Sequence, residues 1–345
     1  MRYDESFKEA AMELLALLWS HLGGQERQDL FTWRYEKNPF SIDPHIYLAR
    51  YNGQLIGFKS FVEQRFRMGQ DRPVRAFTPS DAIVHPAFRR KGVSSSLSKE
   101  FFERAGSLPT GEAVVFNLSS NALSTPGNLK LGWQSTSGKK HFVLRTSPGH
   151  YLPARSKGRH WPLESTGLSA PSGKQVVIAP LPRADEMSQL AYNSRKPGIL
   201  VNERSREYYH WRYALQPEKY LFAFLYDGGE MDAFAVIRRV SNTQYLLWEY
   251  ACGEPNSLRE LTGVVVNACK IPFLRSWALS ADDARLLKSC GFWSIPGKLR
   301  RLLGKEGLPV LVRPTSLDAS SHDFFLAGKD IRDINNWQFF LADRH

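Results

Sequence analysis

The chain has 345 residues, of which 42% are hydrophobic and 12% aromatic. This length and composition exclude collagen-like and disordered classes, and they predict two domains that each bury a core. Lysine and arginine number 46 against 34 acidic residues, a formal net charge of +12. Such an excess predicts a polyanionic partner: nucleic acid, an anionic membrane or a phosphorylated small molecule. The sequence contains no run of 18 apolar residues, so we expect no transmembrane helix.

The N-terminal segment has acidic residues early and apolar residues at helical spacing. It predicts an amphipathic helix rather than a signal peptide, which would carry a basic flank. Cys252, Cys269 and Cys290 lack the spacing of metal ligands or of a disulfide framework. We therefore expect no metal and a cytoplasmic protein.

The first half predicts a mixed α and β order that opens with antiparallel hairpins. Asn52-Gly53 is a strong hairpin signal, because a type I′ turn needs positive φ. Helices are expected near residues 7–22, around Trp33, and near residues 92–105 and 122–130. Strands are expected near residues 46–50, 54–64, 74–84, 113–117 and 141–145.

Residues 147–175 are rich in Pro, Gly and Ser and predict a linker or long loop. The expected domains are therefore residues 1–146 and 176–345. In the second half we expect strands near residues 220–225, 233–240, 246–250 and 273–278, and helices near residues 257–268 and 281–289.

Two motifs occur in both halves and in the same order. Residues 31–35 read FTWRY and residues 209–213 read YHWRY, and a Lys-Leu-Gly-Trp at residues 130–133 resembles residues 288–292, KSCGF. Ordered recurrence predicts that one domain has been duplicated, with chance matching of short motifs as the alternative.

The segment after the strand at residues 74–84 has the features of an anion site. Pro86 ends the strand, three cations follow at residues 89–91, and Gly92 precedes a helix with serines in its first turn. A helix N-terminus has unpaired N–H groups and the positive end of the dipole, and small residues let a phosphate approach it. The alternative is a solvated basic turn; the order of strand, Pro, cations, Gly and small residues favours a phosphate site.

The spacing Val84-x-Pro86-x-x-Arg89-x-x-Gly92-x-Ser94 resembles motif A of the GNAT acetyltransferase superfamily, which usually has Gly or Ala where Ser94 stands. Asn117, Asn121 and the Lys-Leu-Gly-Trp are similar to the downstream motif B. The resemblance implies an α+β fold, here two GNAT-like domains that each have a mostly antiparallel mixed sheet flanked by helices. It also implies acetyl-CoA as acyl donor, with no metal.

The resemblance assigns the cofactor contacts position by position. The pantetheine arm would bind the backbone of the strand, and the pyrophosphate would bind the loop and the first turn of the helix. The implied residues are Ala82, Ile83, Val84, Arg89, Arg90, Lys91, Gly92, Val93, Ser94, Ser95, Asn121 and Asn128. The family's tyrosine, often the acid that protonates the departing thiolate, falls on Asn128, which cannot donate a proton as an acid.

Candidates for the remaining chemistry are carboxylates near the expected acetyl group. Asp81 is the first candidate, as base or as a contact for a substrate ammonium, against the alternative of an ordinary polar residue at a strand. Glu63 on the preceding strand is the second. Arg34 and Asn117 are candidate substrate contacts, although the recurrence of Trp-Arg-Tyr favours a packing role for that motif.

The second half has no Arg-x-x-Gly loop between strand and helix; residues 250–256 stand there, and Glu254 would repel phosphate. We expect a GNAT-like domain without a cofactor. The resulting hypothesis is an N-acetyltransferase for a small amine, such as an amino sugar or polysaccharide precursor, with no membrane or nucleic-acid partner. The alternatives are a FemX-like aminoacyl transferase using charged tRNA and a non-enzymatic nucleic-acid-binding protein.

Overall fold

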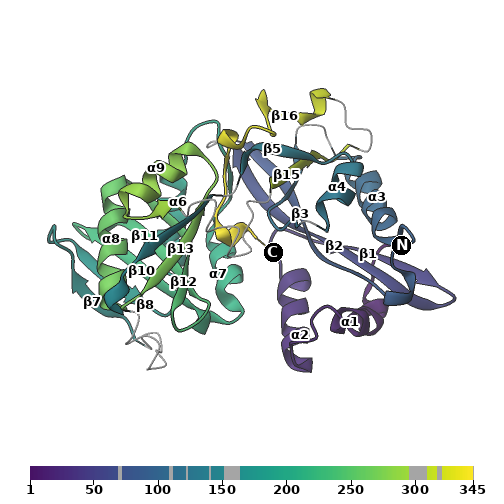
Figure 1. Ribbon diagram of the computed structural model, residues 1–345, viewed down its shortest axis with the longest axis horizontal. Coiled ribbons are helices and arrows are strands. Elements are labelled where there is room, and N and C mark those ends of the chain that lie inside the picture. Colours follow the sequence, from purple (N-terminus) through teal and green to yellow (C-terminus); the bar gives the residue numbers. More distant parts are fainter. Residues whose placement is uncertain are drawn as a thin grey trace. The chain divides into compact units, whose positions relative to one another are not determined.

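The computed structural model describes residues 1–68, 72–108, 112–121, 123–139, 141–150, 164–294, 309–316 and 321–344. Two compact units make up the chain (Figure 1). The first unit comprises residues 1–137 and 309–336, and the second comprises residues 138–308 and 337–344. None of the helices in these described ranges is long and apolar enough to cross a membrane.

The first unit is a mixed sheet with helices on both faces, in the strand order β1–β2–β3–β4–β15–β5 (Figure 1). Its helices are α1 (Lys8–Ala16), α2 (Gly24–Phe31), the π-helical turn η2 (Thr32–Glu36), α3 (Val93–Ala105) and α4 (Thr125–Lys130). Its strands are β1 (His45–Tyr51), β2 (Gln54–Met68), β3 (Arg72–Val84), β4 (Ala113–Asn117), β5 (Gln134–Lys139), β15 (Pro309–Pro314), β16 (Phe325–Leu326) and β17 (Lys329–Asp330). The expected α+β class and the expected strands of this part are confirmed.

The expected helix at residues 7–22 is shorter in the structure. It ends at Ala16, and the N–H groups of Leu18 and Trp19 both donate to the carbonyl of Leu15 in tight turns. These turns bring the Trp19 indole into the core, where 4% of the residue is exposed. The expected start of α4 at Ala122 lies outside the described residues.

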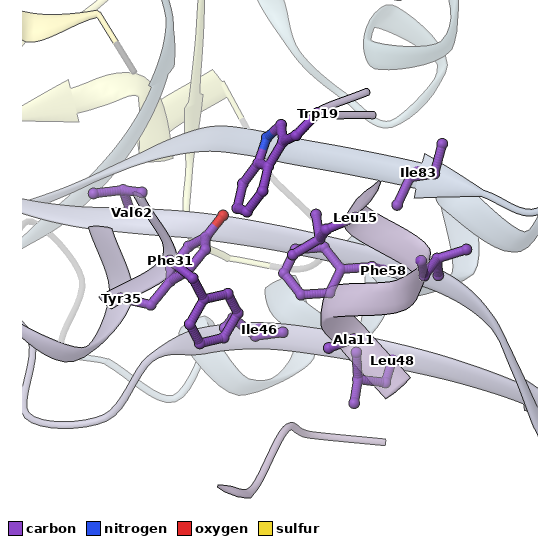
Figure 2. Packing of buried hydrophobic residues seen from close by; sticks show 11 residues of the cluster. Ala11, Leu15, Trp19, Phe31, Tyr35, Ile46, Leu48, Phe58, Val62 and Ile83 are labelled. Carbon is purple, nitrogen blue, oxygen red and sulfur yellow. The ribbon is translucent and has the colours of Figure 1, made fainter. Parts of the chain in front are cut away.

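Separate cores cover the two faces of the first sheet. On one face α1 and α2 pack against a cluster that Figure 2 shows, in which Trp19 lies over Tyr35 and Phe31. On the other face α3 packs against a cluster in which Phe61 and Phe101 stack with ring centroids 3.7 Å apart. Because side chains alternate along a strand, each residue of β2 belongs to one face only.

A glycine sets the distance between α3 and the sheet. A Cβ built on Gly57 would lie 2.7 Å from Cγ1 of Val93 and 3.3 Å from Cδ1 of Leu97. These side chains belong to the first turns of α3, so Gly57 lets the start of this helix lie directly on β2.

The second unit is built around the strand order β14–β6–β13–β12–β11–β10–β8–β7. Its helices are α6 (Ala184–Asn193), α7 (Arg206–Ala214), α8 (Pro255–Ala268) and α9 (Ala281–Ser289). Its strands are β6 (His141–Thr146), β7 (Thr166–Ser169), β8 (Gln175–Ala179), β9 (Leu200–Asn202), β10 (Tyr220–Asp227), β11 (Glu230–Arg239), β12 (Gln244–Cys252), β13 (Phe273–Ala278), β14 (Trp293–Ser294) and β18 (Trp337–Gln338). Strands β9 and β18 pair in parallel.

Each sheet contains a strand that comes from the far end of the other half of the sequence. Strand β6, expected as the last strand of a domain ending at residue 146, pairs instead with β13 and β14 of the second unit. Strand β15 pairs with β4 of the first unit. The boundary between the two units therefore lies after Ser137, because β6 pairs with strands of the second unit and β15 pairs with a strand of the first. Within the segment expected as a linker, residues 166–169 form strand β7, and its last residue, Gln175, begins strand β8.

We predict that Gly57→Ala destabilises the protein by about 1–3 kcal/mol, because the added methyl overlaps branched side chains that cannot move away. Urea unfolding measures the change. Gly24→Ala is the matched control: a Cβ there meets no atom within 4 Å, so we expect no loss, or a gain of up to about 1 kcal/mol from helix propensity. Equal stabilities of the two variants would contradict the close packing of α3.

Candidate active site

The carboxyl end of β3 has one edge without a strand partner in the described part of the chain. Strands β3 and β4 pair in parallel only from Arg75 to Phe77, whereas β3 continues to Val84 beside β2. The N–H of His85 donates to Ile56 of β2. Because successive residues of a strand point to opposite edges, Ala82 and Val84 direct their backbone groups to the open edge.

The open edge is the part of the site that an extended amide ligand would pair with. Of the three backbone positions predicted from sequence, Ala82 and Val84 point outward, while Ile83 faces β2 and buries its side chain in the core. The carbonyl of Val84 accepts a hydrogen bond from Nε of Arg89 at 3.2 Å, which fastens the following loop to the strand.

The loop after β3 places backbone N–H groups and cations at one point. Pro86–Phe88 forms a short 3-10 turn, and Gly92 has φ of 80° immediately before α3. No side chain caps this helix N-terminus, so the first-turn N–H groups, including those of Val93, Ser94 and Ser95, are available to an anion.

Three exposed cations surround that helix end. Arg89, Arg90 and Lys91 are all exposed, and none of them forms an ion pair within the described ranges. Arg90 holds a left-handed backbone, with φ of 63°, a conformation that a non-glycine residue adopts at some cost and that is frequent at functional sites. The arrangement therefore fits phosphate groups in both charge and geometry.

Asp81 lies at the start of the open-edge segment, on the face covered by α1 and α2. Its carboxylate accepts hydrogen bonds from the Trp19 indole at 3.1 Å, from the Tyr35 hydroxyl at 2.6 Å and from the Arg34 guanidinium. Burial, together with the charge of Asp81, raises the pKa of Tyr35 well above its usual value, so this hydroxyl stays a donor. The arrangement neutralises the carboxylate with Arg34 and fixes its orientation.

Two members of this network have no distinctive signal in the sequence. Trp19 gave no signal beyond the helical pattern, and Ser60 gave none. The Ser60 hydroxyl accepts from the backbone N–H of Asp81 at 3.1 Å and contacts the Tyr35 hydroxyl at 2.8 Å. Ser60 lies where the register between β2 and β3 shifts, so the bulge and the polar network occur together.

Glu63 faces the opposite side of the sheet from Asp81. It forms a two-pronged pair with Arg75 at 2.6 and 2.9 Å and a hydrogen bond with His45 at 3.1 Å. Burial opposes ionisation, but the hydrogen bonds from His45 and Arg75 outweigh it and lower the pKa of Glu63. The structure does not bring the two predicted carboxylates together.

The asparagines predicted from sequence have local roles in their turns. Oδ1 of Asn117 accepts from the N–H of Ser119 at 2.8 Å, and Oδ1 of Asn121 accepts from the N–H of Leu123 and of Ser124 at 2.9 Å. Asn128 lies half-buried on α4.

The corresponding strand end in the second unit is closed. The N–H of Gly253 donates to Asp232 of β11, so Tyr250 directs its backbone groups to the edge of β12 away from β11. Nη1 of Arg204 donates to the Tyr250 carbonyl at 3.0 Å and to Glu249 at 3.2 Å. Glu254 precedes α8 as its N-cap residue, so a carboxylate stands where an anion would bind.

An open strand edge beside a cationic, uncapped helix N-terminus defines a site for a ligand with a phosphate group and an extended amide arm. Residues 8–123 match the model of the Acetyltransferase (GNAT) family. This part of the chain is therefore a GNAT acetyltransferase domain, and the protein is an acyltransferase.

Solved structures with the same fold are similar to this chain over most of its length. A probable N-acyltransferase from Enterococcus faecalis matches with a TM-score of 0.64 and 11% identity, covering 92% of this chain and 72% of that one. A GCN5-related N-acetyltransferase from Kribbella flavida matches with 0.59 and 15%, covering 91% and 70%, and one from Anabaena variabilis with 0.60 and 7%, covering 92% and 72%. No curated protein matches the sequence.

We predict that Glu63→Gln destabilises the fold by about 1–3 kcal/mol at neutral pH, because the buried Glu63 side chain loses the charge that strengthens its hydrogen bonds with His45 and with the more exposed Arg75. The pKa of Glu63 is lower in the folded protein than its ordinary value of 4.5. The contribution is therefore present above about pH 4.5 and disappears as the pH falls through the folded-state pKa.

Urea unfolding of both proteins between neutral and acid pH measures this difference. Glu100→Gln is the control, since Glu100 pairs with Arg104 one turn away on the exposed face of α3, and we expect a change below about 0.5 kcal/mol. A difference for Glu63→Gln that stays constant down to acid pH would contradict the ion pair.

Proposed function

We propose that the first unit transfers an acetyl group from acetyl-CoA to a small amine, such as an amino sugar or polysaccharide precursor. The observation that carries this proposal is the alignment of an open strand edge with the uncapped N-terminus of α3 and three exposed cations. The pantetheine amides pair with the backbone of Ala82 and with the N–H of Val84, and the phosphates bind at residues 89–95. The family match supports acyl transfer by this unit.

Bound acetyl-CoA would supply a thioester carbonyl that an amine can attack. The chain must exclude competing water, orient the amine and accept its proton. We assign the proton to Asp81, the carboxylate that lies next to Ala82 at the bulge. Because its oxygens already accept bonds from Trp19, Arg34 and Tyr35, proton uptake requires that one of these donors turn away, for example Arg34 toward an acidic group of the acceptor.

We also infer that the second unit is a diverged copy that has lost the cofactor. Tyr35 donates to Asp81, and Tyr213 donates to Glu249 at 2.6 Å. Glu249 precedes Gly253 by the same number of residues that separate Asp81 from His85, and a bulge accompanies both acids. This recurrence supports duplication, and Arg204 takes the backbone carbonyl that the cofactor would need.

A second internal match joins a helix-ending glycine to an arginine. Gly132 has φ of 81° and lies against Arg313 of β15, and Gly291 has φ of 83° and lies against Arg145 of β6. In each unit the arginine is therefore on the strand that comes from the other half of the sequence. Such a shared detail supports common descent of the two units better than the short motifs alone.

The test is binding of acetyl-CoA measured by thermal shift. A ligand at 100 times its Kd stabilises the folded state by about 2.7 kcal/mol, and we expect Gly92→Glu to abolish this shift because a carboxylate repels phosphate. Gly173→Glu is the matched control. Gly92 and Gly173 have φ of 80° and 87°, and a Cβ on either meets no atom within 4 Å, so the conformational strain is the same.

Retained binding by Gly92→Glu would place the phosphates elsewhere. A shift produced by RNA but not by acetyl-CoA would overturn the proposal in favour of a nucleic-acid partner. Transfer of labelled acetyl groups to amino sugars, amino acids and polyamines then identifies the acceptor class.

A further inference from the structure

A lysine is buried in the first sheet beside the cofactor strand. Lys59 lies on β2 opposite Ala82 of β3 and opposite Tyr47 of β1, and 9% of the residue is exposed. Its Nζ lies 5.8 Å from the ring centroid of Phe61. Within the described ranges it forms no ion pair and donates no hydrogen bond, which is unusual because a buried ammonium is costly unless it is paired.

The position of Lys59 relates it to the open edge. Gly57, Lys59 and Phe61 alternate along the face of β2 that α3 covers, and α3 begins above Gly57. On the neighbouring strand, Ala82 is exposed and turns its backbone to the open edge. Lys59 is therefore one strand away from the backbone of Ala82, which would bind the pantetheine arm. It lies on the face of the sheet that is covered by α3, the helix whose N-terminus would bind the phosphates.

The matching position of the second unit holds no lysine. The hairpin residues Tyr51 and Gln54 pair in β1–β2, and Asp227 and Glu230 pair in the same way in β10–β11. Counting from these pairs, Ala235 occupies the place of Lys59. It lies opposite Tyr250, where Lys59 lies opposite Ala82. In the second unit, whose strand edge is closed, the buried Ala235 occupies this position.

Acetyl transfer to an amine breaks a carbon–sulfur bond and leaves a thiolate, which needs a proton. Asn128 has no acidic proton, and the phenol of Tyr35 is on the opposite face, bonded to Asp81. Burial lowers the pKa of Lys59 to about 8, close to the value of about 8.5 for an ordinary protein thiol. A proton can therefore pass between such groups with little change in free energy.

We propose that Lys59 is the proton donor to the sulfur of CoA as the acetyl group leaves. This inference rests on the proposed function. As the acceptor nitrogen forms its bond to the carbonyl carbon, the carbon–sulfur bond breaks and its electron pair stays on sulfur. The Lys59 ammonium gives one proton to that sulfur and becomes a neutral amine. The proton lost by the acceptor goes to Asp81, and Lys59 regains a proton from solvent before the next turnover.

The test measures the thiol of bound CoA rather than turnover. The ultraviolet absorbance of the thiolate is recorded against pH for CoA in complex with the wild-type protein and with Lys59→Met, which keeps the apolar volume. An ammonium next to sulfur favours the thiolate, so we expect the thiol to ionise about one pH unit lower in the wild type, a tenfold difference in thiolate below its pKa. Lys99→Met, on the exposed part of α3, is the control and should match the wild type.

The outcomes separate the two proposals. Equal thiol titrations in the wild-type and Lys59→Met complexes would overturn the role of Lys59, while the acetyl-CoA site would stand. Absence of any CoA complex with the wild type would overturn the proposed function itself.

Lys59→Arg provides a second test of proton donation if Lys59→Met does not fold. A guanidinium keeps its positive charge but does not release its proton, so we expect the low thiol pKa to be retained while kcat falls about 100-fold and the KM for acetyl-CoA stays unchanged. An unchanged kcat would contradict proton donation.

Discussion

The structure of the site depends on one constraint: β3 and β4 stop pairing after three residue pairs, although β3 continues. A strand edge in a protein interior must satisfy its backbone groups, by a neighbouring strand, a side chain or a ligand. In the first unit the edge at Ala82 and Val84 remains accessible, and the cationic loop and α3 begin where the strand ends. In the second unit Arg204 donates a hydrogen bond to the backbone carbonyl of Tyr250. The same strand end is therefore open at Ala82 in the first unit and occupied by Arg204 in the second.

Charge and apolar packing act together around this edge. Gly57 allows α3 to lie on the sheet, which fixes the direction of its N-terminus relative to the strand end. Polar residues then divide between the faces: the Asp81 network lies under α1 and α2, while Lys59 and Glu63 lie on the face of α3. Such a division would place the proposed proton acceptor, Asp81 of β3, and the proposed proton donor, Lys59 of β2, in separate environments on opposite faces of the sheet, as a reaction that moves two protons requires.

Much of this arrangement is visible in the sequence, where it is encoded locally. The strand, Pro86, the three cations and Gly92 are contiguous, so the sequence alone predicts an anion site there, and the match of residues 8–123 confirms the GNAT resemblance. Strands β4 and β13 and helix α9 have the predicted bounds. The exchange of β6 and β15 could not be predicted, because the residues of a strand do not by themselves specify which distant strands it pairs with. Trp19 and Ser60 were missed because a turn and a bulge far apart in sequence bring them to Asp81. Lys59 was missed because its burial depends on neighbours from other elements. The separation of Asp81 and Glu63 onto opposite faces follows from strand register, which composition does not reveal.

Amide hydrogen exchange with and without CoA tests the central claim most directly. The claim is that the cofactor completes the open edge of β3, so the N–H groups of Ala82 and Val84, together with the first turn of α3, should exchange more slowly in the complex. The N–H groups at the end of β12 should not change. Unaltered exchange at Ala82 and Val84 in a saturated complex, or protection at β12 instead, would contradict the account.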